Sequence, residues 1–217
     1  MTGSVFLNHA AQSICKQFFK LGHSCTFSGI GAAKWNKTGH GYTRVLIYFE
    51  EAKQMKKVLV IMGSDSDLKV MEKCIDRLKS FDIPTEVRIC SAHRTPAVAE
   101  QLAKNAAADG FGVIIAAAGK AAHLGGVLAA QTILPVIGVP MGTSVMGGMD
   151  SLLSIVQMPK GIPVATVAID GADNAAILAA QMLALSDEGL AAKLQQFKTD
   201  MANEVIAKDE KIRAQFA

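Results

Sequence analysis

The chain has 217 residues, of which 50% are hydrophobic, and a formal net charge of +3. This apolar content suffices for one sizeable core, while Gly, Pro or a charge interrupts every apolar run before the roughly 20 residues that a membrane span needs. Residues 55–217 carry 16 Lys/Arg and 17 Asp/Glu, a balance that excludes the basic surface typical of nucleic-acid-binding proteins.

Residues 1–54 differ in composition from the rest of the chain. They hold six Lys/Arg against two Asp/Glu, and eight of the 12 aromatic residues. One short β-like run, 45–49, stands out, and no sustained periodicity surrounds it. We expect an N-terminal extension over 1–54 that is poorly ordered and has no catalytic role, followed by a single domain over 55–217.

The residues just before Met55 suggest a reason for the difference in composition between 1–54 and 55–217. Adjacent Glu50 and Glu51 require purine-rich codons that resemble a ribosome-binding site, and Met55 follows shortly after. Our hypothesis is that natural translation starts at Met55. The intact mass of the protein made from its own locus tests it, and a chain beginning at Met1 would contradict it.

From Lys57 onward, β-rich runs alternate with helical patterns, which indicates β-α units around a parallel sheet. The predicted strands are 58–62, 85–90, 112–117, 135–139 and 163–168. The predicted helices are 67–80, 96–108, 121–132, 151–157 and 172–185, with a last amphipathic helix over 187–207. Thr95 supplies an N-cap hydroxyl and Pro96 a first helical residue, so a helix should begin there.

Near-continuous apolar strands predict a sheet that is covered on both faces. The expected architecture is therefore a three-layer α/β/α sandwich with a C-terminal helix. Because only five good strands are present, a flavodoxin-like parallel five-stranded sheet is favoured over the six-stranded Rossmann order.

The first strand of this sheet ends in Gly63-Ser-Asp-Ser-Asp67. Gly63 permits close approach of a ligand, and the free N–H groups and hydroxyls suit a phosphate. The alternative is a capping box built from Ser64 to Asp67. The loop lacks the spacing of a dinucleotide fingerprint and the lysine of a Walker loop.

The second strand ends in Ser91-Ala-His-Arg-Thr-Pro96. Arg94 beside Ser91 can bind a phosphate bidentately. His93 would project over the same crevice as a proton donor or acceptor, because the carboxyl ends of parallel strands form the ligand crevice. The alternative for His93 is a hydrogen bond that holds the loop.

The third strand leads into Ala116-Ala-Ala-Gly-Lys-Ala-Ala-His-Leu-Gly-Gly126. Its small residues leave room for a planar ligand. We expect His123 one turn inside the next helix, where packing is favoured over catalysis. A further Gly/Met-rich stretch, 140–150, is either a mobile lid or an ordinary surface loop.

The four cysteines form no pair or cluster with metal-ligand spacing, so no metal site is expected. Unpaired cysteines are typical of a reduced cytoplasmic location.

Four motifs in this order resemble one family. Gly-Ser-Asp-Ser-Asp, Ser-Ala-His-Arg-Thr-Pro, Ala-Ala-His-Leu and the run from Asp150 to Pro159 are similar to those of the 5-(carboxyamino)imidazole ribonucleotide mutase family of purine biosynthesis. The resemblance covers essentially all of 55–210. It implies an isomerase that converts N5-carboxyaminoimidazole ribonucleotide to 4-carboxy-5-aminoimidazole ribonucleotide, on the way to IMP, without metal, nucleoside triphosphate or organic cofactor.

The resemblance also implies residue roles. His93 matches the histidine that shuttles the proton while carbon dioxide leaves N5 and is captured by C4. The residues expected to contact substrate are Ser64, Ser66, Asp67, Ser91, Arg94, Ala118, Gly119, Lys120, His123 and Leu124. Of these, Ser64, Ser91 and Arg94 would hold the phosphate and Asp67 the ribose hydroxyls, while Ala118 and Gly119 would border the imidazole and carbon dioxide.

Ala117, Lys120 and Gly125 depart from the pattern Gly-Ala-Gly-Gly-Ala-Ala-His-Leu-Pro-Gly of the family. Lys120 either assists binding of the phosphate or carboxylate or points outward. The family assembles as a homo-octamer, and residues 140–160 with the C-terminal helix are candidates for the contacts. No nucleic-acid or membrane partner is expected.

Two alternatives to the mutase stay open. One is a phosphoribosylaminoimidazole carboxylase that uses free carbon dioxide, although the Ala-Ala-His-Leu pattern favours the mutase. The other is a non-catalytic nucleotide-binding module of flavodoxin-like fold, in which the loop at Gly63 and Arg94 would bind phosphate and nothing more.

Overall fold

The computed structural model describes residues 32–38, 41–47 and 55–216. The chain divides into two units, Met1–Gln54 and Met55–Ala217. None of the helices in the described part combines the length and the apolar character that crossing a bilayer requires.

In the first unit, the described backbone forms two antiparallel strands, β1 (Ala32–Thr38) and β2 (Gly41–Ile47). The predicted β-like run 45–49 overlaps the end of β2, and its last two residues lie outside the described part. Strand β1 was not predicted, because its sequence Ala-Ala-Lys-Trp-Asn-Lys-Thr does not alternate regularly. We expected poor order over 1–54, and most of these residues lie outside the described part of the chain.

The second unit is built on a parallel sheet with the strand order β4-β3-β5-β6-β7. Its strands are β3 (Lys57–Met62), β4 (Thr85–Ile89), β5 (Phe111–Ala118), β6 (Val136–Pro140) and β7 (Ala165–Thr166). Numbered along the domain, this is the order 2-1-3-4-5, so the predicted flavodoxin-like α/β fold is confirmed.

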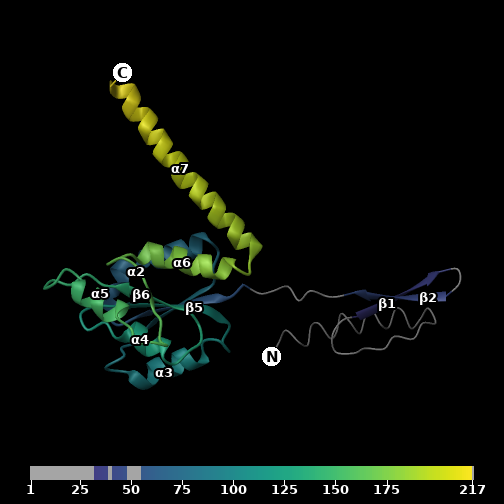
Figure 1. Ribbon diagram of the computed structural model, residues 1–217, viewed down its shortest axis with the longest axis horizontal. Helices are drawn as coiled ribbons and strands as arrows, with labels where there is room; N and C mark the ends of the chain where they lie inside the picture. The colour runs from purple at the N-terminus through teal and green to yellow at the C-terminus, as the bar shows by residue number, and fades with distance from the viewer. Residues whose placement is uncertain (1–31, 39–40, 48–54, 217) are drawn as a thin grey trace. The chain divides into compact units, whose positions relative to one another are not determined.

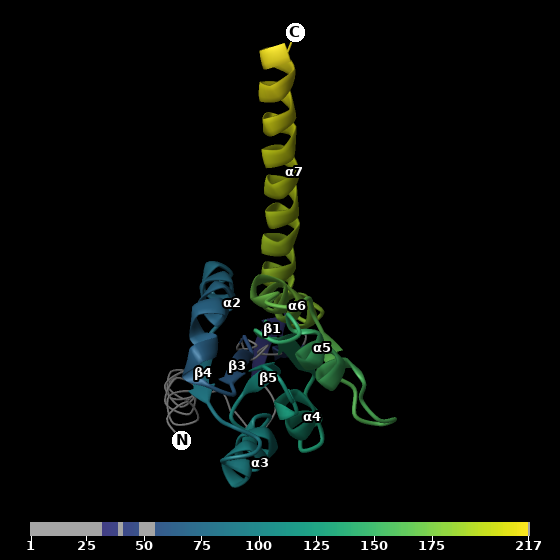
Figure 2. The ribbon, with the colours of Figure 1, turned by 90° about the vertical axis from the view of Figure 1, so that its left-hand side faces the viewer.

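Helices cover both faces of this sheet. They are α2 (Leu68–Ser80), α3 (Pro96–Asn105), α4 (Leu124–Ala129), α5 (Met149–Val156), α6 (Ala172–Ala184) and α7 (Glu188–Phe216), with a short 3-10 turn, η1 (Asp65–Asp67), before α2. Helices α2 and α6 lie on one face, while α3 and α4 lie on the other (Figures 1 and 2). The far half of α7 projects away from the sheet and its helices (Figure 2).

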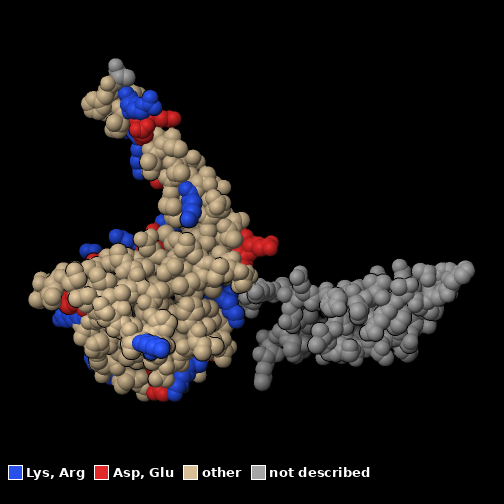
Figure 3. Space-filling model, viewed as in Figure 1, with Lys and Arg blue, Asp and Glu red and all other residues tan. Residues whose placement is uncertain are grey.

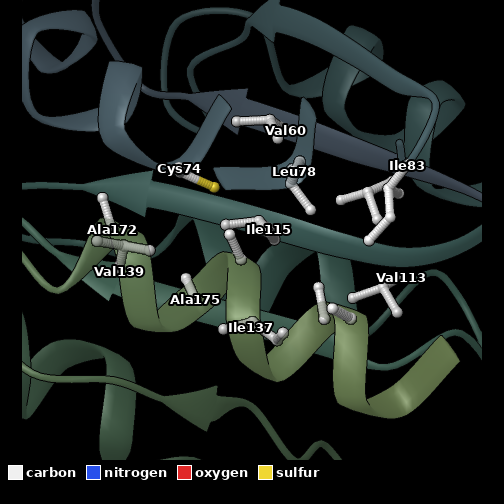
Figure 4. Close-up of a cluster of buried hydrophobic side chains, with 14 of the residues drawn as sticks. Val60, Cys74, Leu78, Ile83, Val113, Ile115, Ile137, Val139, Ala172 and Ala175 are labelled. Atoms are coloured by element: carbon white, nitrogen blue, oxygen red, sulfur yellow. The ribbon is translucent and has the colours of Figure 1, made fainter. Parts of the chain in front are cut away.

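The strand periodicity of two divides the core into two apolar clusters. On one face, Val60 of β3, Ile115 of β5 and Ile137 of β6 pack against α2 and the alanine-rich side of α6 (Figure 4). Their neighbours in sequence, such as Ile61 and Ile114, pack against α3, α4 and α5 on the other face.

One close approach explains a glycine in the sheet. Gly138 of β6 faces α5, and a Cβ atom there would lie 2.3 Å from Cγ2 of Ile155. Because real Cβ contacts are essentially never that short, any side chain at position 138 would push α5 off the sheet. This packing brings α5 close to β6.

The ends of several elements differ from those predicted. Strand 163–168 shortens to Ala165–Thr166, and the last helix continues past 207 to Phe216 through residues that favour helix. Helix α4 begins at Leu124 rather than 121, because the preceding residues form a tight turn. Thr95 occupies the N-cap of α3, but its hydroxyl bonds Ser91 and caps no helical N–H, so the predicted cap bond is wrong.

Candidate active site

The site lies at the carboxyl edge of the parallel sheet. The chain leaves β3 and β5 there in opposite directions along the sheet, and ligands of doubly wound folds bind at such a reversal. The loops after β3, β4, β5 and β6 line one cavity of about 580 Å³. Every predicted site residue lines it: Ser64, Ser66, Asp67, Ser91, His93, Arg94, Ala118, Gly119, Lys120, His123 and Leu124. What they bind stays a prediction at this point.

The loop after β3 presents two hydroxyls to the cavity. Ser64 is the N-cap of η1, where its hydroxyl accepts a hydrogen bond from the Ser66 N–H at 3.3 Å. The side chain of Asp67 accepts from the Ser64 N–H at 3.2 Å, which completes a capping box. The capping alternative is therefore confirmed, and the same residues line the cavity.

Asp67 is a buried carboxylate within this loop, with 9% of its surface exposed. Burial raises its pKa above the ordinary value, and the hydrogen bonds from the Ser64 N–H and the Ser66 hydroxyl oppose that rise. A carboxylate whose position is fixed by two donors is suited to accept hydrogen bonds from ligand hydroxyls.

Arg94 connects the loops after β4 and β3. Its Nη2 donates to the carbonyl oxygen of Gly63 at 3.2 Å, and its backbone N–H donates to Oγ of Ser91, also at 3.2 Å. Thr95 adds rigidity, because its hydroxyl donates to the Ser91 carbonyl and accepts from the Ser91 N–H, both at 3.0 Å. The Arg94 guanidinium and the Ser91 hydroxyl are thus held in place at the cavity, an arrangement suited to an anion.

The two histidines of the second unit are hydrogen-bonded to each other. Nε2 of His93, from the loop after β4, lies 2.8 Å from Nδ1 of His123, and the rings meet edge to face with centroids 5.0 Å apart. The prediction that His123 lies one turn inside the helix is wrong, because His123 is the N-cap residue of α4. This hydrogen bond needs one proton between the two nitrogens, so the pair can hold and release a proton while it stays connected.

The loop after β5 supplies the small wall of the cavity. Ala118 ends the strand with 7% of its surface exposed, and Gly119 follows, where an added Cβ would lie 3.5 Å from Cβ of Met141, an ordinary contact distance. Leu124, 2% exposed, closes the inner side at the start of α4. A planar ring can lie against this part of the backbone because no large side chain occupies it.

The sequence indicated either a mobile lid or a surface loop at 140–150, and none of its residues was predicted to be part of the cavity wall. Met141, Gly142, Thr143 and Ser144 line it beside the residues named above. The N–H of Gly142 donates to Oδ1 of Asp170 at 2.8 Å, which ties this loop to the end of the next β-α connection. The available signal was the position of 141–144 at the end of a strand, where the same rule that selected the other three loops applies.

The two cysteines of the second unit do not contribute to the cavity. Cys74 and Cys90 are both free and buried. Burial, together with the charge of Asp173, raises the pKa of Cys74 to about 12, so its thiol stays protonated in the folded protein. Among residues 55–216, no group of three or more His, Cys, Asp or Glu side chains is placed to hold a metal ion.

Comparisons with known proteins show the family of this chain. A family model described as AIR carboxylase matches residues 57–204. An N5-carboxyaminoimidazole ribonucleotide mutase of Methanocaldococcus jannaschii is 53% identical over 159 residues, which cover 73% of this chain and 99% of that protein. The mutase of Mycobacterium leprae is 56% identical over 153 residues, 70% of this chain and 90% of that protein. The crystal structure of Treponema denticola PurE matches with a TM-score of 0.66 and 32% identity, over 71% of this chain and 96% of that one.

Proposed function

We propose that this chain, which belongs to the AIR carboxylase family, is an N5-carboxyaminoimidazole ribonucleotide mutase, an isomerase of purine biosynthesis. It converts N5-carboxyaminoimidazole ribonucleotide to 4-carboxy-5-aminoimidazole ribonucleotide. The observation that carries the residue roles below is the hydrogen-bonded pair of His93 and His123 inside the cavity that also holds Ser91 and Arg94.

The phosphate of the substrate is assigned to the side of the cavity formed by β3 and β4. Arg94 is held there by Gly63 and Ser91, so its remaining donors are oriented before a ligand arrives. The hydroxyls of Ser64, Ser66 and Ser91 supply further donors from two loops that meet at this point. Asp67, placed deeper in the same loop, accepts hydrogen bonds from the ribose hydroxyls.

The imidazole ring and the migrating carbon are assigned to the wall formed by Ala118 and Gly119, with Leu124 beneath them. These residues carry little or no side chain into the cavity, and Leu124 excludes water from its inner end. A released carbon dioxide molecule held against C4 reacts as an intramolecular partner rather than one drawn from solution.

His93 then moves one proton in each direction. The protonated ring donates its proton to N5 as the bond between N5 and the carboxyl carbon breaks, which gives carbon dioxide and 5-aminoimidazole ribonucleotide. C4 of the ring attacks the carbon dioxide, a new C–C bond forms, and the hydrogen on C4 leaves as a proton to neutral His93. The starting protonation state returns, so the reaction is an isomerisation with no net proton transfer to solvent.

His123 is assigned a positioning role in this cycle. Its Nδ1 holds Nε2 of His93 at 2.8 Å, and it comes from the loop after β5 while His93 comes from the loop after β4. The hydrogen bond fixes the orientation of the His93 ring across the cavity. It also offers a second nitrogen that can share the proton between the two steps.

We further propose a homo-octamer in the cytoplasm. The first part of α7 packs on the domain through Leu190 and Leu194, and the rest of the helix projects away from it (Figure 2). The projecting part carries exposed apolar side chains. Charged side chains of both signs are spread along α7 and leave uncharged surface between them (Figure 3). The apolar side chains offered to neighbouring copies are Val145, Met146, Met149, Leu153 and Val156 in the loop after β6 and α5, and Met201, Val205, Ile206, Ile212 and Phe216 on α7. The mass in solution, measured by light scattering, should be eight times that of the chain, and a monomer would contradict the assembly.

The decisive experiment supplies two substrates to the purified protein. We expect efficient turnover of N5-carboxyaminoimidazole ribonucleotide and little turnover of 5-aminoimidazole ribonucleotide with bicarbonate. Turnover only with the second pair would mean a direct carboxylase, and turnover with neither would mean a binding module.

The variant His93→Asn tests the residue assignment. It should bind the nucleotide nearly as tightly as the wild type, because the phosphate anchors are intact. Its kcat should fall by about 10² to 10⁴, the usual contribution of a positioned acid-base. Full activity in this variant would remove His93 from the mechanism.

A further inference from the structure

Lys120 has a backbone conformation that lysine rarely adopts. Its φ is +57°, in the left-handed region. Within residues 55–216, the other non-glycine residues with positive φ are Asp82 and Asp170, and aspartate tolerates this region because its short side chain bonds to the local backbone. A longer side chain such as lysine is disfavoured there by about 1–2 kcal/mol.

A buried hydroxyl holds this unfavourable conformation in place. The N–H of Lys120 donates to Oγ of Ser151 at 2.9 Å, and that hydroxyl donates in turn to the carbonyl oxygen of Met141 at 2.9 Å. Ser151 is fully buried within α5. The carbonyl oxygen of Lys120 accepts from the Ala122 N–H at 2.8 Å. The surrounding structure therefore specifies the backbone at position 120 through both of its polar groups.

No protein contact accounts for the side chain that this backbone presents. Lys120 is exposed and lines the cavity. Within the described part of the chain, no carboxylate lies within 4 Å of its ammonium, as is also true of other lysines such as Lys69 and Lys160. The fold maintains an unfavourable backbone conformation at the wall of the cavity, and no ion pair of the side chain with another described residue explains it. Such strain is typical of positions that bind a ligand.

The position of Lys120 distinguishes it from the other cation of the cavity. Arg94 follows β4 and bonds to the carbonyl oxygen at the end of β3. Lys120 follows β5 and is held by α5, which comes after β6. In the strand order β4-β3-β5-β6, the backbones of the two cations therefore reach the cavity from opposite sides of the boundary between β3 and β5, with the histidine pair joining the loops after β4 and β5.

We propose that Lys120 binds the migrating carboxylate of the substrate, first as the carbamate on N5 and then as the carboxylate on C4. This inference rests on the proposed function. The proposed substrate carries two anionic groups, a phosphate, which is assigned to Arg94, and a carboxylate at the imidazole ring. Lysine is suited to this role because its ammonium is a compact charge on a flexible stem, which can follow a carboxylate as it moves between two ring atoms.

The test compares two ligands that differ only in that carboxylate. Binding of 4-carboxy-5-aminoimidazole ribonucleotide and of 5-aminoimidazole ribonucleotide is measured by calorimetry on the wild type and on Lys120→Met, which keeps the length of the side chain and removes its charge. Affinity for the carboxylated ligand should fall about tenfold, which corresponds to about 1.4 kcal/mol. Affinity for the ligand without the carboxylate should change less than twofold.

Further variants separate charge, backbone and bulk. Lys120→Gly suits the positive φ, so it should fold at least as stably as the wild type and show the same selective loss. Lys120→Arg should retain most of the affinity for the carboxylated ligand. The matched control is Lys104→Met, since Lys104 pairs with Glu100 on the surface of α3 away from the cavity, and it should leave both affinities unchanged.

Two outcomes would overturn the inference. Equal weakening of both ligands in Lys120→Met and Lys120→Gly would place the ammonium at the phosphate, and no weakening of either would make it a surface lysine. These results are distinguishable from failure of the proposed function, because in that case the wild type itself would not convert N5-carboxyaminoimidazole ribonucleotide.

Discussion

The two faces of the sheet and its carboxyl edge differ in the side chains that they carry and in how those side chains are packed. On the faces, strand and helix side chains such as Ile115 and Ile137 are fully buried, and each apolar side chain packs against others of its kind. At the edge, exposed polar side chains come from four loops, and Lys120 has a positive φ that lysine disfavours. We therefore expect stability to depend mainly on the faces, and the proposed chemistry to depend on loops at the edge that the packed faces hold in place.

The largest effect on stability should come from the faces. Ile115→Ala removes a fully buried side chain at the centre of the sheet, so it should lower the free energy of unfolding by about 2–5 kcal/mol. Denaturant unfolding measures this loss. Under conditions where the variant is folded, its affinity for 5-aminoimidazole ribonucleotide should equal that of the wild type, and a matching loss of affinity would mean that faces and edge are not separable.

Ser151 is buried within α5 and bonded to residues of the cavity wall, so it connects the faces of the sheet with its carboxyl edge. Substitution of Ser151 should therefore affect both stability and substrate binding. Ser151→Ala leaves the Lys120 N–H and the Met141 carbonyl oxygen without their buried partner. The expected loss is about 1–3 kcal/mol of unfolding free energy. Because the same bonds position the cavity wall, KM for the substrate should also rise. Ser80→Ala, which removes an exposed hydroxyl at the end of α2, serves as the control and should change neither quantity appreciably. Loss of stability with an unchanged KM would contradict a link between the two.

Asp67 should show a smaller effect, visible in the dependence of stability on pH. Its pKa in the folded protein is raised by burial, so the folded state resists ionisation of this group more than the unfolded state does. Relative to Asp67→Asn, the wild type should therefore lose stability as pH rises from the ordinary pKa of aspartate through the raised value, and the difference should be constant below and above that interval. Unfolding curves of both proteins over this pH range measure it, and the opposite slope would show that the hydrogen bonds from Ser64 and Ser66 outweigh burial.

The smallest effect should come from removing residues 1–54. The family match begins at residue 57, and every residue assigned to the cavity lies beyond it. A chain that begins at Met55 should therefore keep the kcat and KM of the full chain within about twofold. A large loss of activity would give the first unit a role in the site.

The sequence predicted the faces and the edge unequally well. The apolar runs at 58–62 and 112–117 predicted β3 and β5, because a strand that is buried on both faces is apolar at nearly every position. The loop residues were found through one rule, that parallel strands deliver their carboxyl ends to one edge. Contacts between loops were not predictable in this way: the bond between His93 and His123 joins residues 30 apart, and the positive φ of Lys120 depends on a hydroxyl in α5.

The failures have local physical causes. Ala121 and Ala122 favour helix by propensity, yet the tight turn after Lys120 delays α4 until Leu124. Thr95 is a good N-cap by type, but its hydroxyl bonds the backbone of Ser91 in the neighbouring loop instead. In both places, tertiary contacts at the edge of the sheet override a sound local preference.

The central claim is that the carboxyl group migrates within one cavity, and isotope retention tests it most directly. N5-carboxyaminoimidazole ribonucleotide labelled at its carboxyl carbon is converted by the wild-type protein in the presence of excess unlabelled bicarbonate, and the product is analysed by mass spectrometry after a single turnover. The mutase described above should pass the label to 4-carboxy-5-aminoimidazole ribonucleotide almost completely. A product that carries mainly unlabelled carbon would contradict it, because the carboxyl group would then come from solution.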